Sequence, residues 1–320
     1  MIGVEDVVAA SAAIGTRLHR TPMLSSASLG QASGGSVYLK AELFQRTGSF
    51  KVRGVLTKLA SLSAEEKKRG VIAISAGNHA GAVAYCCALE GIDALIVTWA
   101  SASAQKIAAT RGYGAEVDQE AATAGEAFTR MEALQEQSGR TLVHPFDDPF
   151  VLAGQGTIGL EILEDRPDVE VVIVPAGGGG LVSGISVAVK AVRPDVRVVA
   201  VEPEGSSVLK LGLEAGEPVS IEPKSVADGL NAPFAGRLPI EICAVLLDDH
   251  VSLTEAEIRA GFRFLYERAK LAAEPAGAVT AAALLAGKIP AAKGSVAVAV
   301  VSGGNVVAET ASAILTSNEG

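Results

Sequence analysis

Short apolar runs alternate with amphipathic segments along nearly the whole chain. The apolar runs are rich in valine, isoleucine and alanine, as is typical of buried β-strands, and the segments between them show the helical repeat of apolar positions. The predicted strands are Val37–Ala41, Val71–Ser75, Ala94–Trp99, Thr141–Val143, Val171–Pro175, Arg197–Val201 and Val296–Val301. The predicted helices are Val52–Leu59, Asn78–Leu89, Ala102–Arg111, Thr123–Gln137, Val151–Leu163, Leu181–Val192, Glu255–Lys270 and Ala276–Leu285. This alternation predicts an α/β fold with helices on both faces of parallel sheets and with ligands at the carboxyl ends of the strands.

Local signals mark several helix ends. Gly91 and Gly112 follow helical segments at positions where a glycine commonly stops a helix. Thr254 and Glu257 have the spacing of a capping box, which would start the helix Glu255–Lys270. No repeat, low-complexity tract or linker rich in Pro, Gly and Ser divides the chain. A second lobe must therefore be inserted through short connections.

The composition favours a globular enzyme. The 320 residues are 49% hydrophobic and carry a net charge of −9 without a basic patch, so we do not expect nucleic acid as a partner. Cys86 and Cys87 are adjacent on one predicted helix and Cys243 stands alone, which argues against a disulfide framework. Glu5 and Asp6 are not typical of a signal peptide, and no apolar segment is long enough to span a membrane. We therefore expect a cytoplasmic protein.

Four successive glycines, Gly177–Gly180, are the most informative local pattern. They lie directly between the strand Val171–Pro175 and the helix Leu181–Val192. Without Cβ atoms the backbone N–H groups can converge on one point, and the helix N-terminus adds a positive dipole end, so the pattern predicts a phosphate-binding loop. No Lys-Ser/Thr pair follows, which excludes a Walker nucleotide loop. A flexible turn is the alternative interpretation.

Three further loops lie where ligands should bind. Thr47–Lys51 opens a helix, where burial and the helix dipole would lower the pKa of the Lys51 amine, as a lysine that forms an imine requires. Ser75–His79 follows a strand and offers free N–H groups suited to a carboxylate, although it could be only an N-cap. Ser302–Asn305 has the same strand–glycine–helix order and could equally be a tight turn.

Two single residues near these loops each have two interpretations. Arg53, two residues after Lys51, is either a helix-surface charge or a charge that keeps the lysine neutral by repulsion. His144 is either a buried imidazole with satisfied hydrogen bonds or a catalytic group. The sequence does not decide between them.

Taken in this order, the motifs resemble those of the fold-type II pyridoxal-phosphate enzymes (the tryptophan synthase β-like fold), and most closely the threonine/serine dehydratases. The resemblance covers nearly the whole chain and extends to the serine racemases. It runs through Ser49–Gly54, Ser75–His79, Gly154–Gly159, Gly177–Gly180, Ala227–Gly229, Glu274–Ala278 and Ser302–Asn305. Each motif alone is a weak signal, but the ordered set is highly specific.

The resemblance implies pyridoxal 5'-phosphate as the cofactor. Lys51 would bind it covalently and act as the catalytic residue, and Phe50 would pack against its ring. The phosphate would be bound by Gly177, Gly178, Gly179, Gly180 and the N–H group of Leu181. Asn78 would hydrogen-bond to the phenolic oxygen, Glu274 would lie near the ring, and Ser302 would face the pyridine nitrogen. A neutral hydroxyl there would leave the nitrogen largely unprotonated, which suits elimination better than transamination.

The resemblance also implies a substrate site and a reaction. The substrate carboxylate would be bound by the loop of Ser75, Ala76, Gly77, Asn78 and His79. The expected reaction is α,β-elimination from L-threonine or L-serine, with Lys51 as general base, to give a 2-oxo acid and ammonia. The expected partners are this small molecule and further copies of the chain, in a homodimer or homotetramer.

The implied fold has two domains. The large cofactor-binding domain would comprise residues 1–68 and 148–320. The small α/β domain, residues 69–147, would be inserted between its two parts. Both domains would contain parallel sheets flanked by helices.

Two departures from the family pattern limit this interpretation. Serine racemases have a serine just before the Gly-Asn of the carboxylate loop as an acid/base group, and this chain has Ala76 there, so we do not expect racemisation. Many relatives bind a divalent cation through an acid at the Glu202 position, a carbonyl near Ser206 and an acid two residues later, where this chain has Val208. Because valine offers no oxygen ligand, we expect no metal site.

Several alternatives stay open at this point. Within the same cofactor class they are a racemase, a dehydratase of 3-hydroxyaspartate or phenylserine, and a sulfhydrylase, whose carboxylate loop typically reads Ser-Gly-Asn-Thr. From another class, an NAD-dependent dehydrogenase would use Glu202 to bind a ribose. The motif Gly-x-Gly-x-x-Gly/Ala is not met, however, since Val182 or Ser183 stands at its last position. A ligand-binding module without activity would leave the Lys51 loop without a purpose.

Overall fold

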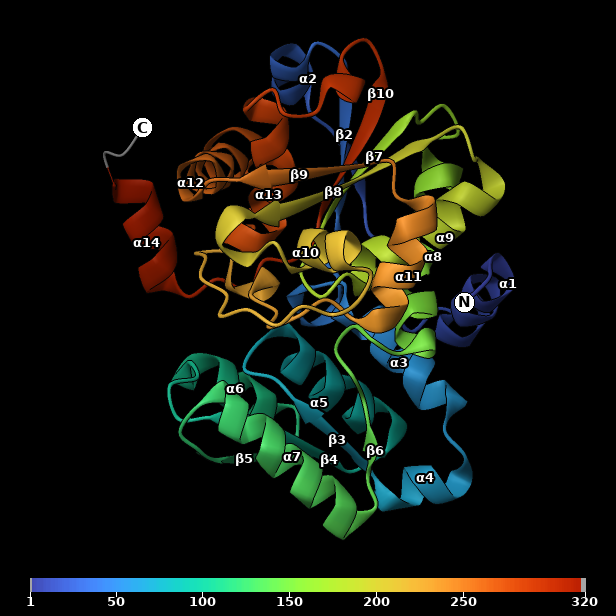
Figure 1. Ribbon diagram of the computed structural model, residues 1–320, viewed down its shortest axis with the longest axis vertical. Helices are drawn as coiled ribbons and strands as arrows, with labels where there is room; N and C mark the ends of the chain where they lie inside the picture. The colour runs from blue at the N-terminus through green and yellow to red at the C-terminus, as the bar shows by residue number, and fades with distance from the viewer. Residues whose placement is uncertain (1, 318–320) are drawn as a thin grey trace.

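The computed structural model describes residues 2–317 and consists of two lobes, each built around a β-sheet (Figure 1). Within these residues the larger lobe has a six-stranded sheet in the order β1-β2-β10-β7-β8-β9, and the smaller lobe has a four-stranded sheet in the order β5-β4-β3-β6. The strands of the larger sheet are β1 (Met23–Ser25), β2 (Ser36–Ala41), β7 (Val171–Pro175), β8 (Arg197–Pro203), β9 (Asp249–Leu253) and β10 (Val296–Val301). Those of the smaller sheet are β3 (Val71–Ile74), β4 (Ala94–Trp99), β5 (Glu116–Ala121) and β6 (Thr141–Leu142).

Helices cover both sheets. In chain order the α-helices are α1 (Val4–Ile14), α2 (Ala27–Ser33), α3 (Lys51–Ser61), α4 (Ala64–Arg69), α5 (Asn78–Glu90), α6 (Ala104–Gly112), α7 (Ala124–Ser138), α8 (Pro149–Asp165), α9 (Gly180–Val192), α10 (Val208–Ala215), α11 (Arg237–Leu246), α12 (Glu255–Phe264), α13 (Pro275–Leu285) and α14 (Ala308–Thr316). The smaller sheet is formed by one continuous stretch of chain, and the larger sheet by the segments before and after it (Figure 1). The domain boundaries at residues 68 and 148 stay a prediction.

The predicted elements are present, and several keep their predicted bounds. Strands β4, β7 and β10 begin and end where the apolar pattern places them. The capping box of Thr254 and Glu257 starts α12, and Gly91 ends α5 in a left-handed conformation. The helix predicted over Glu255–Lys270 is α12 followed by a π-turn, Leu265–Ala269. Gly112 is the last residue of α6 rather than the residue after it.

The pattern does not predict β1, β5 and β9, which lie at sheet edges. Neighbouring strands pair in parallel, as the predicted fold class requires, except for the edge strand β1, which is antiparallel to β2. An edge strand buries less of its surface than a central one, so no continuous apolar run is needed. Polar residues stand throughout β5 (EVDQEA) and at the start of β9 (DHVSL).

Both faces of the larger sheet are buried, as predicted. Alternate residues of β7 point to opposite faces: Val171 and Ile173 pack with α12 and α13, and Val172 and Val174 pack with α8 and α9. This alternation follows from the two-residue repeat of a strand.

Helix α3, which begins at Lys51, is held in place by close packing on α8. A Cβ atom added at Gly154 of α8 would lie 2.6 Å from Gly54 Cα of α3, and one added at Gly156 would lie 2.8 Å from Gly184 O of α9. The glycines of the segment Gly154–Gly159 therefore allow three helices to pack with their backbones in near contact. This motif positions the lysine without contacting it.

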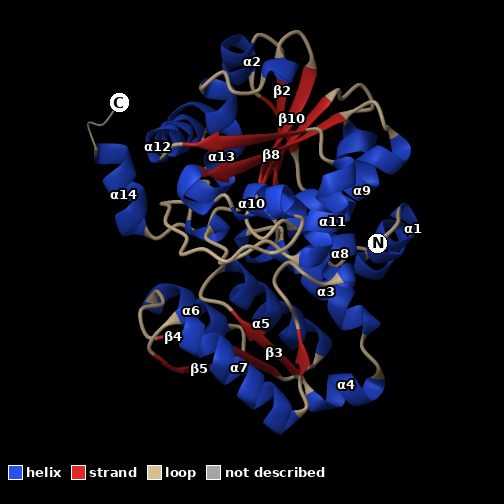
Figure 2. Ribbon diagram, in the orientation of Figure 1, coloured by secondary structure: helices blue, strands red, loops and turns tan. Residues whose placement is uncertain are grey.

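Loops from both sheets gather between the two lobes (Figure 2). The loop after β3 and the loops after β7 and β10 lie at the carboxyl ends of parallel strands, where ligands are expected. None of the described helices is both long and apolar enough to cross a membrane.

Candidate active site

Lys51 is the first residue of α3, and its amine is enclosed by protein atoms although the residue as a whole keeps some exposure. Its Nζ donates a hydrogen bond to Pro145 O at 2.8 Å and lies 5.2 Å from the centre of the Phe50 ring. Burial lowers the pKa of Lys51 from its ordinary 10.5 to about 8, and the charge of Glu274 partly opposes this shift. The prediction of a lysine with a lowered pKa at this helix start is confirmed.

The turn before Lys51 is joined by hydrogen bonds to the loop that follows β10. Phe50 N donates to Ser302 O at 3.1 Å, and Gly304 N donates to Gly48 O at 2.9 Å. Thr47 has a φ of +60°, a left-handed conformation that costs a non-glycine residue about 1 kcal/mol or more. The Ser302–Asn305 loop is therefore part of the structure that places Lys51.

Three side chains form a hydrogen-bonded chain beside this turn. Asn305 Nδ2 donates to Thr47 O at 2.7 Å and to Asn78 Oδ1 at 2.8 Å, and Asn78 Nδ2 donates to Glu274 Oε1 at 2.7 Å. Burial, with the nearby charge of Asp228, raises the pKa of Glu274 to about 7. Glu274 is the N-cap residue of α13, but its side chain makes no cap bond and turns to Asn78 instead.

Each of the four glycines is required by its protein neighbours. A Cβ atom at Gly177 would lie 3.0 Å from Leu230 O, and one at Gly178 would lie 2.3 to 2.5 Å from three ring atoms of Phe146. Gly179 has a φ of +89°, and a Cβ at Gly180 would lie 2.9 Å from the backbone of Phe146. Among the described residues, the N–H groups of Gly177 to Leu181 meet no backbone acceptor outside the helix. The loop therefore combines close packing with free donors at a helix N-terminus, which fits an anionic group.

The segment 143–148 packs against the glycine loop through Phe146 and also contacts Lys51 and His79. His144 Nδ1 accepts hydrogen bonds from the N–H groups of Phe146 and Asp147, at 3.3 and 2.8 Å. His144 is half-buried, and these two bonds give its Nδ1 the partners that the first interpretation expects, while a catalytic role of this residue stays untested. Asp147 in turn accepts from the first N–H groups of α11, which are those of Arg237 and Leu238. No sequence pattern marks Pro145 or Phe146 as site residues.

The Ser75–His79 loop leads into the N-terminus of α5. His79 Nε2 lies 2.8 Å from Val143 O, so Nε2 carries the hydrogen, because a carbonyl can only accept. Burial and the nearby Lys51 lower the pKa of His79 to about 3, so its imidazole is neutral. A Cβ added at Gly77 would meet no atom within 4 Å, so this part of the loop has open space beside it. Ser75 Oγ accepts from Gly77 N at 3.1 Å.

Several buried polar atoms beside Lys51 have no hydrogen-bond partner in the described part of the chain. They are Thr47 Oγ1, Ser49 Oγ and Glu274 Oε2. Ser302 is also buried, at the end of β10. Buried polar groups normally have partners, so unpaired atoms grouped with free backbone donors fit a site for a polar ligand.

The burial of Arg53 excludes the first of its two interpretations. The residue is 1% exposed and donates hydrogen bonds to Glu42 at 2.8 and 2.9 Å and to Glu161 at 2.6 and 3.0 Å, so it is not a helix-surface charge. Lys40 joins this cluster with a 2.6 Å bond to Glu161. Burial alone would lower the pKa of Arg53, but the two carboxylates raise it above its ordinary value. The cluster lies behind α3 and ties it to α8.

Glu202 is engaged in the protein's own contacts. Its buried carboxylate accepts hydrogen bonds from Leu209 N at 2.9 Å and Lys210 N at 3.0 Å, at the start of α10, and lies 2.6 Å from His250 Nε2. Val208 is buried beside it. Within residues 2–317 there is no cluster of three or more His, Cys, Asp or Glu that could hold a metal. The same contacts leave Glu202 unavailable to a ribose.

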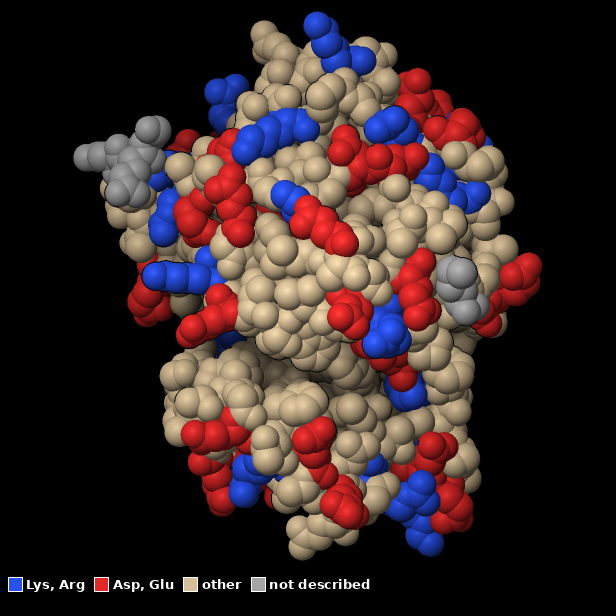
Figure 3. All heavy atoms as spheres, in the orientation of Figure 1, with Lys and Arg blue, Asp and Glu red and all other residues tan. Residues whose placement is uncertain are grey.

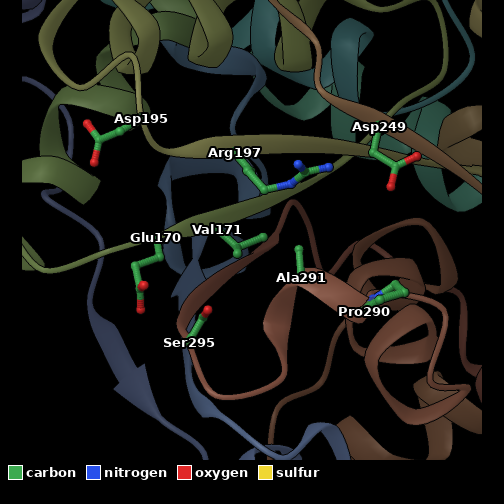
Figure 4. A pocket seen from close by; sticks show the side chains of 8 residues that line it. All are labelled: Glu170, Val171, Asp195, Arg197, Asp249, Pro290, Ala291 and Ser295. Atoms are coloured by element: carbon green, nitrogen blue, oxygen red, sulfur yellow. The ribbon is translucent and has the colours of Figure 1, made fainter.

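The face seen in Figure 3 is hollowed between the lobes, and few charged side chains surround the hollow. A separate cleft of about 510 Å³ lies at the amino ends of the larger sheet's strands. It is lined by Glu170, Val171, Asp195, Arg197, Asp249, Pro290, Ala291 and Ser295 (Figure 4). Glu170 accepts from Val296 N, and Asp195 pairs with Arg193, so these carboxylates already have partners. The cleft is remote from Lys51 and takes no part in its chemistry.

Comparison with known proteins agrees with this geometry. The family described as "Pyridoxal-phosphate dependent enzyme" matches residues 14–303. This chain belongs to that family. It is 46% identical to the L-threonine ammonia-lyase of Thermotoga maritima, over 96% of this chain and 76% of the relative. It is 41% identical to the catabolic L-threonine dehydratase TdcB of Escherichia coli K12, over 95% of this chain and 93% of the relative. The structure of maize serine racemase superposes with a TM-score of 0.92 at 35% identity, covering 96% of this chain and 95% of that one.

The predicted fold class and cofactor are thereby confirmed. The protein is a fold-type II enzyme, and its cofactor is pyridoxal phosphate. The free N–H groups of the glycine loop fit the phosphate, and the enclosed Lys51 amine fits a covalent bond to the aldehyde carbon. The assignment excludes the NAD-dependent dehydrogenase.

Proposed function

We propose that this protein is a pyridoxal-phosphate-dependent ammonia-lyase that converts L-threonine, and also L-serine, to a 2-oxo acid and ammonia by α,β-elimination. The observation that carries the proposal is the enclosed Lys51 amine, held beside free donors at two helix N-termini, in a chain similar to threonine ammonia-lyases and dehydratases. When bound, the cofactor supplies an electron sink for the pair left when the α-proton is removed.

We assign the cofactor's phosphate to the N–H groups of Gly177, Gly178, Gly179, Gly180 and Leu181. The positive end of the α9 dipole favours an anion there. Phe50, Asn78, Glu274 and Ser302 would surround the ring, with one N–H group of Asn78 toward the phenolic oxygen. Ser302 would offer a hydroxyl rather than a carboxylate to the pyridine nitrogen.

Lys51 would take the α-proton as general base. A base must be unprotonated near neutral pH, and the lowered pKa of about 8 leaves a useful fraction of the amine neutral. Pro145 O accepts a hydrogen from Nζ, so it orients the amine without stabilising a positive charge as a carboxylate would.

The substrate carboxylate would be bound at the N-terminus of α5 by the Ser75–His79 loop. Because His79 is neutral, the attraction comes from backbone N–H groups and the helix dipole rather than from an imidazolium. The side chain of Ala76, in this loop, is a methyl group, which can neither donate nor accept a proton. This favours elimination over racemisation.

Borohydride treatment and a substrate panel test the proposal. Reduction of the holoenzyme should fix the cofactor to the peptide that contains Lys51, and Lys51→Ala should remove both the adduct and turnover. Lys67→Ala, in the exposed helix α4, is the matched control and should retain both. Release of 2-oxo acid would be compared for L-threonine, L-serine, 3-hydroxyaspartate and phenylserine. An adduct on another lysine, or no 2-oxo acid from any of the four, would refute the assignment.

We further propose that the protein is cytoplasmic and forms a homo-oligomer. The free, buried cysteines Cys86, Cys87 and Cys243 suit a reducing compartment. An apolar groove of about 560 Å³ is bordered by α1, α3, α8 and α11, and Phe150 beside it is 44% exposed, which suits contact with a second copy. Light scattering on the protein as it elutes from a size-exclusion column would measure its mass in solution. A monomer at micromolar concentration would contradict the proposal of a homo-oligomer.

A further inference from the structure

The side chain of Asn305 joins its own loop, which follows β10, to two other parts of the site. Its Nδ2 donates to Thr47 O, in the turn before Lys51, and to Asn78 Oδ1, at the first turn of α5. A Cβ atom at Gly48 would lie 2.5 Å from Asn305 Oδ1, so this oxygen already sits against the Gly48 backbone. The side chain thus contacts the lysine-bearing segment and a helix of the smaller lobe at once.

The orientation of the Asn305 and Asn78 side-chain amides follows from Thr47 O, the one group in this series of hydrogen bonds that can only accept. Thr47 O is a carbonyl and can only accept, so the nitrogen of Asn305 must face it. The second hydrogen of that nitrogen then points to Asn78, which must present its oxygen. Asn78 is left with its nitrogen toward Glu274.

Glu274 alone would not fix this direction. A carboxylate requires the nitrogen of Asn78, but a protonated carboxyl group can equally donate to its oxygen, and the raised pKa of Glu274 makes both forms accessible. If Asn78 flipped, it would present its oxygen where the phenolic oxygen of the cofactor needs a donor. Only Asn305 holds the amide against this flip among the hydrogen bonds found in residues 2–317.

We infer that Asn305 is a positioning residue: it orients the Asn78 amide so that one N–H group remains for the cofactor's phenolic oxygen, and it couples that orientation to the turn before Lys51. The inference rests on the proposed function. The residue does not contact the reacting atoms, and its effect should pass through Asn78.

A double-mutant cycle tests this coupling with pyridoxal phosphate itself as the probe. In the presence of Asn78, Asn305→Ala should weaken cofactor binding by roughly tenfold and shift the absorption maximum of the bound cofactor, whereas in the Asn78→Ala background the loss should be below about twofold. The melting temperature of the cofactor-free variants gives a second readout, because a merely structural role lowers it equally in both backgrounds without a spectral shift.

Asn305→Asp keeps the size of the side chain and replaces the donor nitrogen by an oxygen, so it serves if the alanine variant does not fold. It should weaken binding as much as the alanine variant, since Thr47 O would then face an acceptor. Equal losses in both Asn78 backgrounds, or no loss at all, would overturn the inference. A wild-type protein that binds no pyridoxal phosphate would instead refute the proposed function, so the two failures are distinguishable.

Discussion

The contact between Gly178 and Phe146 allows the two roles of the glycine loop to be separated. Replacing Gly178 with alanine would place a methyl group 2.3 to 2.5 Å from three ring atoms of Phe146, far inside contact distance. The ring cannot move away freely, because it packs edge-on against His144 and Phe234, with centroid distances of 4.7 and 5.7 Å. Gly178→Ala should therefore destabilise the cofactor-free protein by about 1–3 kcal/mol, the usual cost of overpacking.

The same substitution should cost far less when Phe146 is absent. In a Phe146→Ala background the methyl group meets a space instead of a ring, so the cost should fall below about 1 kcal/mol. Urea denaturation of the cofactor-free single and double variants would measure this coupling, and titration with pyridoxal phosphate would report separately on phosphate binding. If the methyl group also obstructs the phosphate, the affinity of the Gly178→Ala/Phe146→Ala double variant for pyridoxal phosphate should stay low.

Gly179→Ala is the matched control for this cycle. Gly179 has a φ of +89°, and its added Cβ would lie 2.6 Å from Pro239 rather than against the ring. It should destabilise the protein by a similar amount in both Phe146 backgrounds, because neither the strain nor the contact involves that residue. Equal costs of Gly178→Ala with and without Phe146 would show that the reasoning from packing is wrong.

Three further outcomes follow from the site. Lys51→Met should stabilise the cofactor-free protein at pH 7 by up to about 3 kcal/mol, because the wild type must bury a charged amine there. Between about pH 8 and 10.5 the unfolded chain holds a proton that folded Lys51 has released, so the wild type gains stability and the advantage of the variant should disappear. Thermal melts at several pH values would measure the difference, and a difference that does not vary with pH would contradict the prediction. Ala76→Ser should add α-proton exchange with inversion to the dehydratase activity, measured by chiral chromatography in D₂O, and a wild type that already racemises would argue against the role given to Ala76. Millimolar Mg²⁺ or Ca²⁺ should change the melting temperature little, because Val208 offers no ligand and Glu202 is bound to backbone N–H groups and His250; a shift of several degrees would show that a site exists.

The parts of the fold that sequence alone predicts are those whose own residues determine them. Central strands such as Val171–Pro175 are buried on both faces, so they appear as apolar runs with definite ends. Edge strands such as Glu116–Ala121 gain their identity from a neighbour in the sheet, and their sequence shows mostly polar residues. The short antiparallel strand Met23–Ser25 is set by its pairing with Ser36–Ala41, which no local pattern records.

The candidate site divides in the same way. Lys51 and the glycine loop are visible because each combines an unusual residue pattern with a helix start, and the structure brings them into one region. Asn305 and Phe146 could not be assigned a role from sequence, because their contacts are with residues far away in the chain. Asn305 bonds to Asn78 across 227 residues, and Phe146 packs against Gly178 across α8 and β7. The roles of individual site residues in binding cofactor and substrate stay predictions.

Two buried cations only two positions apart show how the fold controls charge at the site. Arg53 is surrounded by the carboxylates of Glu42 and Glu161, so it stays charged and fixes α3 to its neighbours. Lys51, at the start of the same helix, donates a hydrogen bond to a carbonyl and lies over the Phe50 ring. Within residues 2–317 the carboxyl group that acts on its charge is that of Glu274, whose own pKa is raised to about 7. A lysine at the start of a rigidly anchored helix, left without a close counter-ion, can lose its proton near neutral pH, and this is the property that an imine-forming amine and a general base both need.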